Sequence, residues 1–296
     1  MSIAPGEPGG MPLEIATELY GIGAQIETQR TGEIYAALHA GASFNGLSIT
    51  RDVAYGPHER HVLDVVRSMI TVGARPVVVF VHGGGFRLGQ KSAPDLFYYD
   101  NVMRWVAAND MVGVNINYRL GPEFQWPSGI EDLSRVINWL QQNIVDYGGD
   151  PEEVFFWGHS AGAAHVGDYL ADRTGKGESH GIAGAILTSG FYELGSEVSI
   201  WNAYYGDDVS TYPERSALER LAAADLPLFI NDAELDAETF QPESRKLVDA
   251  RRAAGTPVEY LHLPAHSHIS ELYAVGTDDK SLSDPVLSFI RNQLSQ

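Results

Sequence analysis

The feature that most constrains this chain is the pentapeptide at residues 158–162, which reads Gly-His-Ser-Ala-Gly. It follows an apolar run at residues 154–157 and precedes a segment of small residues that favours a helix. The two glycines flank Ser160 at a distance of two residues and leave space for a strand and a helix to approach each other. A strand, a sharp turn and a helix in this order expose the serine hydroxyl at a sheet edge. Ser160 is therefore the candidate nucleophile, and the alternative is a tight turn whose serine has no role.

A second glycine motif lies upstream, where residues 82–86 read His-Gly-Gly-Gly-Phe after the apolar run at residues 76–81. The run is typical of a buried parallel strand. Successive glycines leave backbone N–H groups unobstructed, as an oxyanion hole requires. We predict that the N–H groups of Gly84, Gly85 and Ala161 form such a hole; the alternative is a flexible glycine-rich loop. A phosphate-binding loop is disfavoured because no Lys-Ser/Thr pair follows and no G-x-G-x-x-G is present.

With both motifs in one chain, the sequence resembles the α/β-hydrolase superfamily. Within it, the chain is similar to carboxylesterases of the hormone-sensitive-lipase type and to the related kynurenine formamidase-like enzymes. The likeness covers about residues 47 to 293 and includes the further stretches 55–57, 63–65, 117–123 and 148–151. It implies a mostly parallel central sheet with helices on both faces, a small helical cap, and a serine hydrolase. The alternation of predicted strands and helices independently favours such a sheet.

The acid of a serine hydrolase of this kind follows the nucleophile in the chain and precedes the histidine. Residues 226–230 have the pattern of a buried strand, and three carboxylates follow it. Strand ends are where such acids lie. The resemblance places the acid at Asp236, with Glu234 as the alternative, and we interpret Asp232 as a solvated loop carboxylate.

The base is expected after the last predicted strand, at residues 258–263, in the loop at residues 264–268. A neutral imidazole accepts the serine proton and returns it to the leaving group, while the carboxylate holds the ring in the required tautomer. His268 resembles the catalytic histidine of the family, although Ser267 stands where the family commonly has Asn. This departure keeps His266 as an alternative base.

The same region offers a rival chemistry, because His262, His266 and His268 together supply three nitrogen atoms of the kind that bind zinc. The strand pattern disfavours a zinc site, since His262 lies within the predicted strand, where a lone histidine usually has a structural role. We predict no metal and no other cofactor.

The composition of the chain limits the number of domains and disfavours several classes of protein. The chain has 296 residues, 44% of them hydrophobic, which suffices for one α/β domain over residues 1–296. A net charge of −19 disfavours nucleic acids and anionic membrane surfaces. No run approaches the roughly 18 apolar residues of a membrane span. Residues 1–10 have neither basic residues nor an apolar segment, so we expect a cytoplasmic protein.

Three segments outside the core carry further predictions. Residues 1–12 are rich in Pro and Gly and are predicted to be a disordered tail. Residues 13–45 and about 192–224 are predicted to contribute to a cap. Phe86, at the end of the glycine motif, and three aromatic residues of the second cap segment, Trp201, Tyr204 and Tyr205, are candidates for contacting the substrate. For the three cap residues, packing of the cap onto the core is the alternative.

The sequence thus predicts a serine carboxylesterase that hydrolyses small or short-acyl esters through an acyl-enzyme intermediate. Its expected partner is a small-molecule ester. Two alternatives stay open: an aryl formamidase or amidase of the kynurenine formamidase type, and a ligand receptor that uses the fold without catalysis. The resembled esterases often dimerise through an edge strand, so a homodimer is a further expectation.

Overall fold

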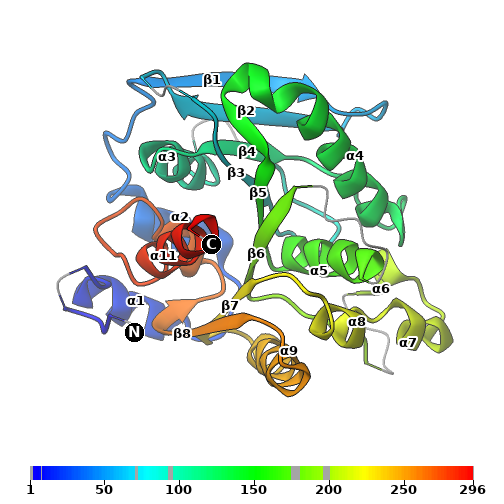
Figure 1. The fold of residues 1–296 in the computed structure, drawn as a ribbon. Helices are drawn as coiled ribbons and strands as arrows, with labels where there is room; N and C mark the ends of the chain where they lie inside the picture. Colours follow the sequence, from blue (N-terminus) through cyan, green and yellow to red (C-terminus); the bar gives the residue numbers. More distant parts are fainter. Residues whose placement is uncertain are drawn as a thin grey trace.

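The computed structural model describes residues 3–7, 9–70, 73–92, 96–174, 181–195 and 201–295. Within these ranges one eight-stranded sheet has the strand order β1-β2-β4-β3-β5-β6-β7-β8 (Figure 1). The strands are β1 (Leu47–Ala54), β2 (Val62–Ser68), β3 (Arg75–Val81), β4 (Val112–Ile116), β5 (Gly149–His159), β6 (Ile182–Thr188), β7 (Leu228–Leu235) and β8 (Val258–Ser267). β1 pairs with β2, and β2 with β4, in antiparallel fashion, while the other neighbours are parallel. The predicted mostly parallel sheet is confirmed.

Residues 77–81 of β3 and 154–157 of β5 form continuous apolar runs, as expected for strands that helices cover on both faces. β3 shows this most clearly, since its side chains alternate between two buried clusters. Val77 and Val79 pack into one cluster, and Val78 and Phe80 pack into the other. The alternation places one hydrophobic core on each face of the sheet.

Helices divide between the two faces (Figure 1). One face is covered by α4 (Ser128–Asn143), α5 (Ala161–Arg173), α8 (Leu218–Ala222) and α9 (Phe240–Ala254), whose buried residues belong to the first cluster. The opposite face is covered by α1 (Leu13–Ile22), α3 (Asp100–Ala108), α10 (Ser270–Tyr273) and α11 (Ser283–Leu294). None of the helices in the described part of the chain combines the length and apolar character needed to cross a membrane.

The N-terminal segment is part of this second face. α1 packs onto β8 through Ile15 and Leu19, and α2 (Thr28–Ala36) lies beside α10. Met11, which falls in the predicted tail, is 1% exposed and belongs to the same core cluster. The structure therefore differs from the prediction at this position, because an apolar side chain before α1 is buried under the sheet.

The excursion after β6 consists of short elements within its described part. They are α6 (Asn202–Tyr205), a 3-10 turn (Val209–Thr211), α7 (Tyr212–Arg215) and α8. Elsewhere in the chain, a second 3-10 turn (Ile144–Tyr147) links α4 to β5. Residues 196–200 of the predicted cap lie outside the described residues. The excursion packs onto α5, because Ala217 and Leu221 join the cluster that contains Val166 and Leu170.

Candidate active site

Ser160 lies in a strained turn between β5 and α5. Its backbone has φ 54° and ψ −121°, in a region that residues with a side chain seldom adopt. The turn is held because the Ser160 N–H donates to the carbonyl of Thr188 at 2.9 Å, and the Ser160 carbonyl accepts the N–H of Ala164 at 3.1 Å. A Cβ on Gly162 would lie 2.0 Å from the Val81 carbonyl oxygen, so only glycine fits there. The predicted strand, turn and helix are present.

The glycine loop after β3 runs directly beside this turn. A Cβ on Gly83 would lie 3.1 Å from the Cβ of Ser160. Gly84 and Gly85 have φ of +131° and +58°, values that glycine adopts without strain. Nδ1 of the buried His82 lies 2.6 Å from the Gly83 carbonyl, and this carbonyl only accepts, so Nδ1 carries the proton. Burial lowers the pKa of His82 to about 3, which keeps the ring neutral and fixes this hydrogen bond.

His268 and Asp236 form a buried pair. His268 follows β8, and its Nδ1 lies 2.7 Å from Oδ1 of Asp236, which follows β7. The other oxygen of Asp236 accepts from the Ser189 hydroxyl at 2.6 Å and the Ala233 N–H at 3.0 Å. Burial alone raises the pKa of Asp236, but His268 and these donors outweigh it and hold the pKa below its ordinary value. The stability that this carboxylate contributes is present above about pH 4 and is lost as the pH falls further.

The alternative acid and base have other partners. Glu234 accepts hydrogen bonds from the Ala265 N–H at 2.7 Å and from the Tyr20 hydroxyl at 2.9 Å. His266 is fully buried, with Nε2 3.2 Å from Asp279. The geometry therefore favours Asp236 and His268 over Glu234 and His266.

The three histidines of the zinc alternative do not converge. Each pairs with a different carboxylate, in the pairs His262 with Asp232, His266 with Asp279, and His268 with Asp236. Among the described residues, metal-like spacing is found instead for His159, His268 and Glu271. Nε2 of His159 is already bonded to the His268 carbonyl, and Nδ1 of His268 is bonded to Asp236. These hydrogen bonds explain why the side chains lie close together.

A row of buried polar side chains crosses the sheet close to His268 and Asp236. The indole N–H of Trp157 donates to the Thr188 hydroxyl at 3.0 Å, and this hydroxyl donates to Asn231 Oδ1 at 2.8 Å. The Asn231 amide in turn donates to Glu271 Oε2 at 2.8 Å. Burial, together with the nearby Asp236, raises the pKa of Glu271 well above its ordinary value, so its carboxyl group is neutral. The row ties β5, β6 and β7 to α10, just after His268.

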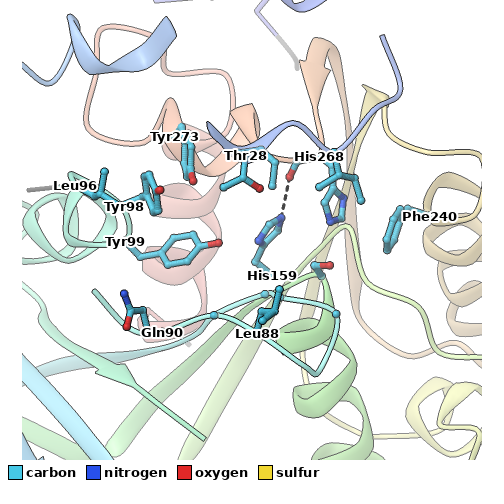
Figure 2. A pocket seen from close by; sticks show the side chains of 17 residues that line it. Thr28, Leu88, Gln90, Leu96, Tyr98, Tyr99, His159, Phe240, His268 and Tyr273 are labelled. Carbon is cyan, nitrogen blue, oxygen red and sulfur yellow. Dashed lines mark hydrogen bonds between the residues drawn. The ribbon is translucent and has the colours of Figure 1, made fainter. Parts of the chain in front are cut away.

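His159 also helps to hold His268 in place. Its Nε2 lies 2.8 Å from the backbone carbonyl of His268 (Figure 2), and this nitrogen carries the proton because the carbonyl only accepts. Burial is the largest cause of a pKa of about 3 for His159, which keeps the ring neutral. Sequence reasoning missed this contact and the polar row. The sequence feature that could have indicated the polar row is the position of Thr188 and Asn231 in neighbouring strands whose carboxyl ends meet beside Ser160.

Ser160 and His268 line the same cavity, of about 600 Å³ (Figure 2). Its wall comes from the glycine loop, from the segment before α2, and from residues near the starts of α3, α9 and α10. The lining residues are Ile26, Thr28, Gly83, Gly84, Gly85, Leu88, Gly89, Gln90, Leu96, Tyr98, Tyr99, His159, Ser160, Phe240, His268, Ile269 and Tyr273. Asp, Glu, Lys and Arg are absent from this described part of the lining. The volume lies in the range of small-molecule sites.

Comparison with solved structures places this arrangement in a known fold. A bacterial heroin esterase superposes with a TM-score of 0.71 at 22% identity, covering 95% of this chain and 97% of that chain. An esterase of the bacterial hormone-sensitive lipase family superposes with a TM-score of 0.70 at 20% identity, covering 96% and 99%. The chain has the α/β-hydrolase fold. The predicted fold class is therefore confirmed.

Sequence comparison agrees with the fold. A family model described as BD-FAE matches residues 63–178 of this chain. Esterase LipQ of Mycobacterium tuberculosis is 29% identical over 248 residues, which are 76% of this chain and 58% of that protein. Pyrethroid hydrolase Ces2e of Rattus norvegicus is 36% identical over 133 residues, 42% of this chain and 22% of that protein. The chain thus spans less than two thirds of the length of these relatives. The resemblance to carboxylesterases of the hormone-sensitive-lipase type is confirmed.

The aromatic residues predicted to contact a substrate are not among the residues that line this cavity. Phe86, Tyr204 and Tyr205 are at most 2% exposed, and Phe86 stacks on Tyr204 with ring centroids 4.9 Å apart. Trp201 is half-buried and packs against Phe191. The alternative interpretation of Trp201, Tyr204 and Tyr205, packing of the cap segment onto the core, agrees with the structure, because burying large rings stabilises that segment more than exposing them in a cavity.

Beside Tyr205 lies a buried acid, Asp168, whose ionisation makes the stability of the fold depend on pH. Asp168 of α5 is 4% exposed and accepts a hydrogen bond from the Tyr205 hydroxyl at 2.9 Å. Burial raises the pKa of Asp168 to about 8. The unfolded chain releases this proton near pH 4 whereas the folded chain keeps it, so stability falls as the pH rises from about 4 to 8.

Asp168→Asn is therefore expected to increase the free energy of unfolding at pH 8, by up to about 5 kcal/mol, and to have a much smaller effect at pH 5. The amide still accepts from Tyr205 but has no proton to lose. Urea unfolding at both pH values measures the difference, with Asp172→Asn on the same helix as control. An equal effect of Asp168→Asn at the two pH values would contradict the assignment.

Proposed function

We propose that the chain is a serine carboxylesterase that hydrolyses small, uncharged carboxylic esters. The observation that carries the proposal is that Ser160, in its strained turn, and His268, paired with Asp236, line one cavity beside the glycine loop. The esterases among the relatives and structural neighbours support the same reaction.

The proposed first step is attack of the Ser160 hydroxyl oxygen on the ester carbonyl carbon. Nδ1 of His268 is bonded to Asp236, so Nε2 is the nitrogen that accepts the serine proton. Asp236 holds the ring in this tautomer and stabilises the imidazolium that forms. Because the pKa of Asp236 is held low, the carboxylate stays ionised through the step.

The carbonyl oxygen becomes negatively charged as the tetrahedral intermediate forms. We assign its stabilisation to the N–H groups of Gly84, Gly85 and Ala161, and losing one such donor typically costs about 3 kcal/mol of barrier. The intermediate collapses when the alkoxide leaves with the proton from His268, giving an acyl-serine. Water, deprotonated by His268, then attacks the acyl carbon. The bond from this carbon to Oγ of Ser160 breaks, the carboxylic acid leaves, and Oγ takes the proton back from His268.

We propose short acyl groups as the preferred substrates. Phe240 stacks on His268 with ring centroids 4.2 Å apart and closes one side of the site (Figure 2). A bulky ring beside the reacting atoms leaves little room for a long acyl chain on that side. The cytoplasmic location, the single domain and the homodimer expected from the sequence stay predictions, which cell fractionation, limited proteolysis and sedimentation would check.

The test is steady-state hydrolysis of p-nitrophenyl acetate, butyrate and octanoate by the chain and by Ser160→Ala. We expect acetate and butyrate to be hydrolysed faster than octanoate, and the substitution to lower kcat by a factor of about 10³ or more. Turnover that survives the substitution would contradict the proposed nucleophile. Faster hydrolysis of an N-formyl aromatic amine than of any ester would favour the formamidase alternative.

A further inference from the structure

One side of the cavity is formed by a group that we call the tyrosine wall, which consists of Leu96, Tyr98, Tyr99 and Tyr273. Figure 2 shows it across His159 from Phe240. Tyr98 and Tyr273 stack with ring centroids 4.5 Å apart and an interplanar angle of 14°, and the ring of Tyr99 stands at 60° to that of Tyr273. Since each ring is held by another, the wall is formed before a substrate arrives.

The Tyr99 hydroxyl is the polar group of this wall that points toward His159, into the middle of the cavity (Figure 2). Tyr99 is 9% exposed, and its ring is held from behind by Phe80, with centroids 4.9 Å apart. The hydroxyl forms no hydrogen bond with any residue in the described ranges. Burial raises the pKa of Tyr99 well above its ordinary value, so the group stays protonated and is available as a donor.

The chemistry of the lining restricts what this donor can meet. Among the described residues that line the cavity, none is Asp, Glu, Lys or Arg. A charged group on the substrate would therefore lose its hydration without gaining an ionic partner. A neutral oxygen, as in an ether, a ketone or a second ester, accepts a hydrogen bond from a tyrosine at a much smaller desolvation cost.

We propose that Tyr99 is a specificity-determining residue, whose hydroxyl donates a hydrogen bond to a neutral oxygen on the part of the ester that lies against the tyrosine wall. The substrate class is an uncharged ester that carries an oxygen acceptor beyond the ester group itself. This inference rests on the proposed function and deepens it. A site built to hydrogen-bond a substrate discriminates against the analogue that lacks the polar atom.

The test compares isosteres in which one ether oxygen replaces one methylene group. In the alcohol arm, methoxybenzyl acetates substituted at each ring position in turn are compared with the corresponding ethylbenzyl acetates. In the acyl arm, methyl methoxyphenylacetates are compared with methyl ethylphenylacetates. We expect kcat/KM to favour the methoxy compound by about five- to tenfold in at least one pair, and the arm in which this occurs identifies the side of the ester that faces Tyr99.

Tyr99→Phe removes only the hydroxyl and is expected to lower kcat/KM for the preferred methoxy compound to that of its ethyl isostere, which abolishes the preference. Tyr147→Phe is the control, because the half-buried Tyr147 also lies beside an aromatic ring, that of Trp139, but is outside the cavity. A preference that is absent from the parent chain, or that survives Tyr99→Phe, would overturn the proposal. So would an equal loss on all esters, since the hydroxyl would then act at the ester group itself.

Binding to Ser160→Ala distinguishes failure of this inference from failure of the proposed function. Calorimetric titration with methoxybenzyl methyl ketones and their ethyl isosteres measures the same preference without turnover. A chain that hydrolyses no ester but binds the methoxy ketones more tightly, in a manner that Tyr99→Phe abolishes, would refute the esterase and support the role of Tyr99. Equal binding of the isosteres at every ring position would overturn the role of Tyr99.

Discussion

Asp236→Asn is expected to lower kcat for p-nitrophenyl acetate by about 10⁴-fold while leaving KM and the free energy of unfolding much less affected. Asparagine has nearly the same shape, but its amide does not hold the Nδ1 proton of His268 as a carboxylate does. The ring then favours the tautomer with the proton on Nε2, the nitrogen that must accept the serine proton. We expect a large fall in kcat from the exchange of one carboxylate oxygen for an amide nitrogen, because Asp236 and His268 are in direct contact at 2.7 Å.

Glu234→Gln is the control for this prediction. Glu234 lies two residues from Asp236 in sequence, but it bonds Tyr20 and the backbone of Ala265. We expect its replacement to change kcat by less than about threefold, since it removes a charge near the site without touching His268. Measurement of kcat and KM for both variants decides between the two acids. A greater loss in Glu234→Gln would show that the acid is assigned to the wrong residue.

Gly162→Ala is expected to lower kcat by at least about 100-fold and to destabilise the fold by about 3 kcal/mol. The added Cβ would lie 2.0 Å from the Val81 carbonyl oxygen and 2.6 Å from that of His82, so α5 and the end of β3 must move apart. This movement separates the Ala161 N–H, on α5, from the N–H groups of the glycine loop. One misplaced oxyanion donor accounts for the predicted fall in rate.

Gly21→Ala provides the comparison, because a Cβ at this exposed position of α1 would meet nothing within 4 Å. Alanine there should leave kcat unchanged and stabilise the helix slightly, by at most about 1 kcal/mol. Urea unfolding and steady-state kinetics on both variants give the two readouts. Parent-like kcat in a folded Gly162→Ala protein would refute the close packing of α5 against β3 at the active site.

The parts of the site that sequence patterns predicted are those that a few consecutive residues determine. The turn at Ser160 needs a strand, small neighbours and a helix, and all of these lie within residues 154–173. The glycine loop is equally local. Even so, the two-residue spacing of Glu234 and Asp236 did not show which one meets His268, because the pairing of β7 with β8 shifts register between Ala233 and Leu235. A strand irregularity of this kind has no clear sequence signature.

The cavity wall was not predictable, because it is assembled from segments that are distant in the chain. Ile26 precedes α2, Tyr99 precedes α3, and Tyr273 ends α10. Only the packing of α1 to α3 and α10 on one face of the sheet brings them together. Conversely, Tyr204 and Tyr205 had the composition of a binding surface, but their rings turn into the core. Whether an aromatic residue lines a cavity or fills a core depends on its neighbours in space, which local patterns do not specify.

Covalent labelling tests whether Ser160 is the nucleophile. The chain contains a second serine beside a histidine, Ser270, whose hydroxyl lies 3.1 Å from His266 Nδ1, but both residues are fully buried. Incubation with an activated phosphonate ester, followed by peptide mass mapping, reports which serine reacts. We predict one adduct, on Ser160, that forms at the rate at which esterase activity is lost and is absent from Ser160→Ala. An adduct on another residue such as Ser270, or loss of activity without an adduct on Ser160, would show that Ser160 is not the nucleophile.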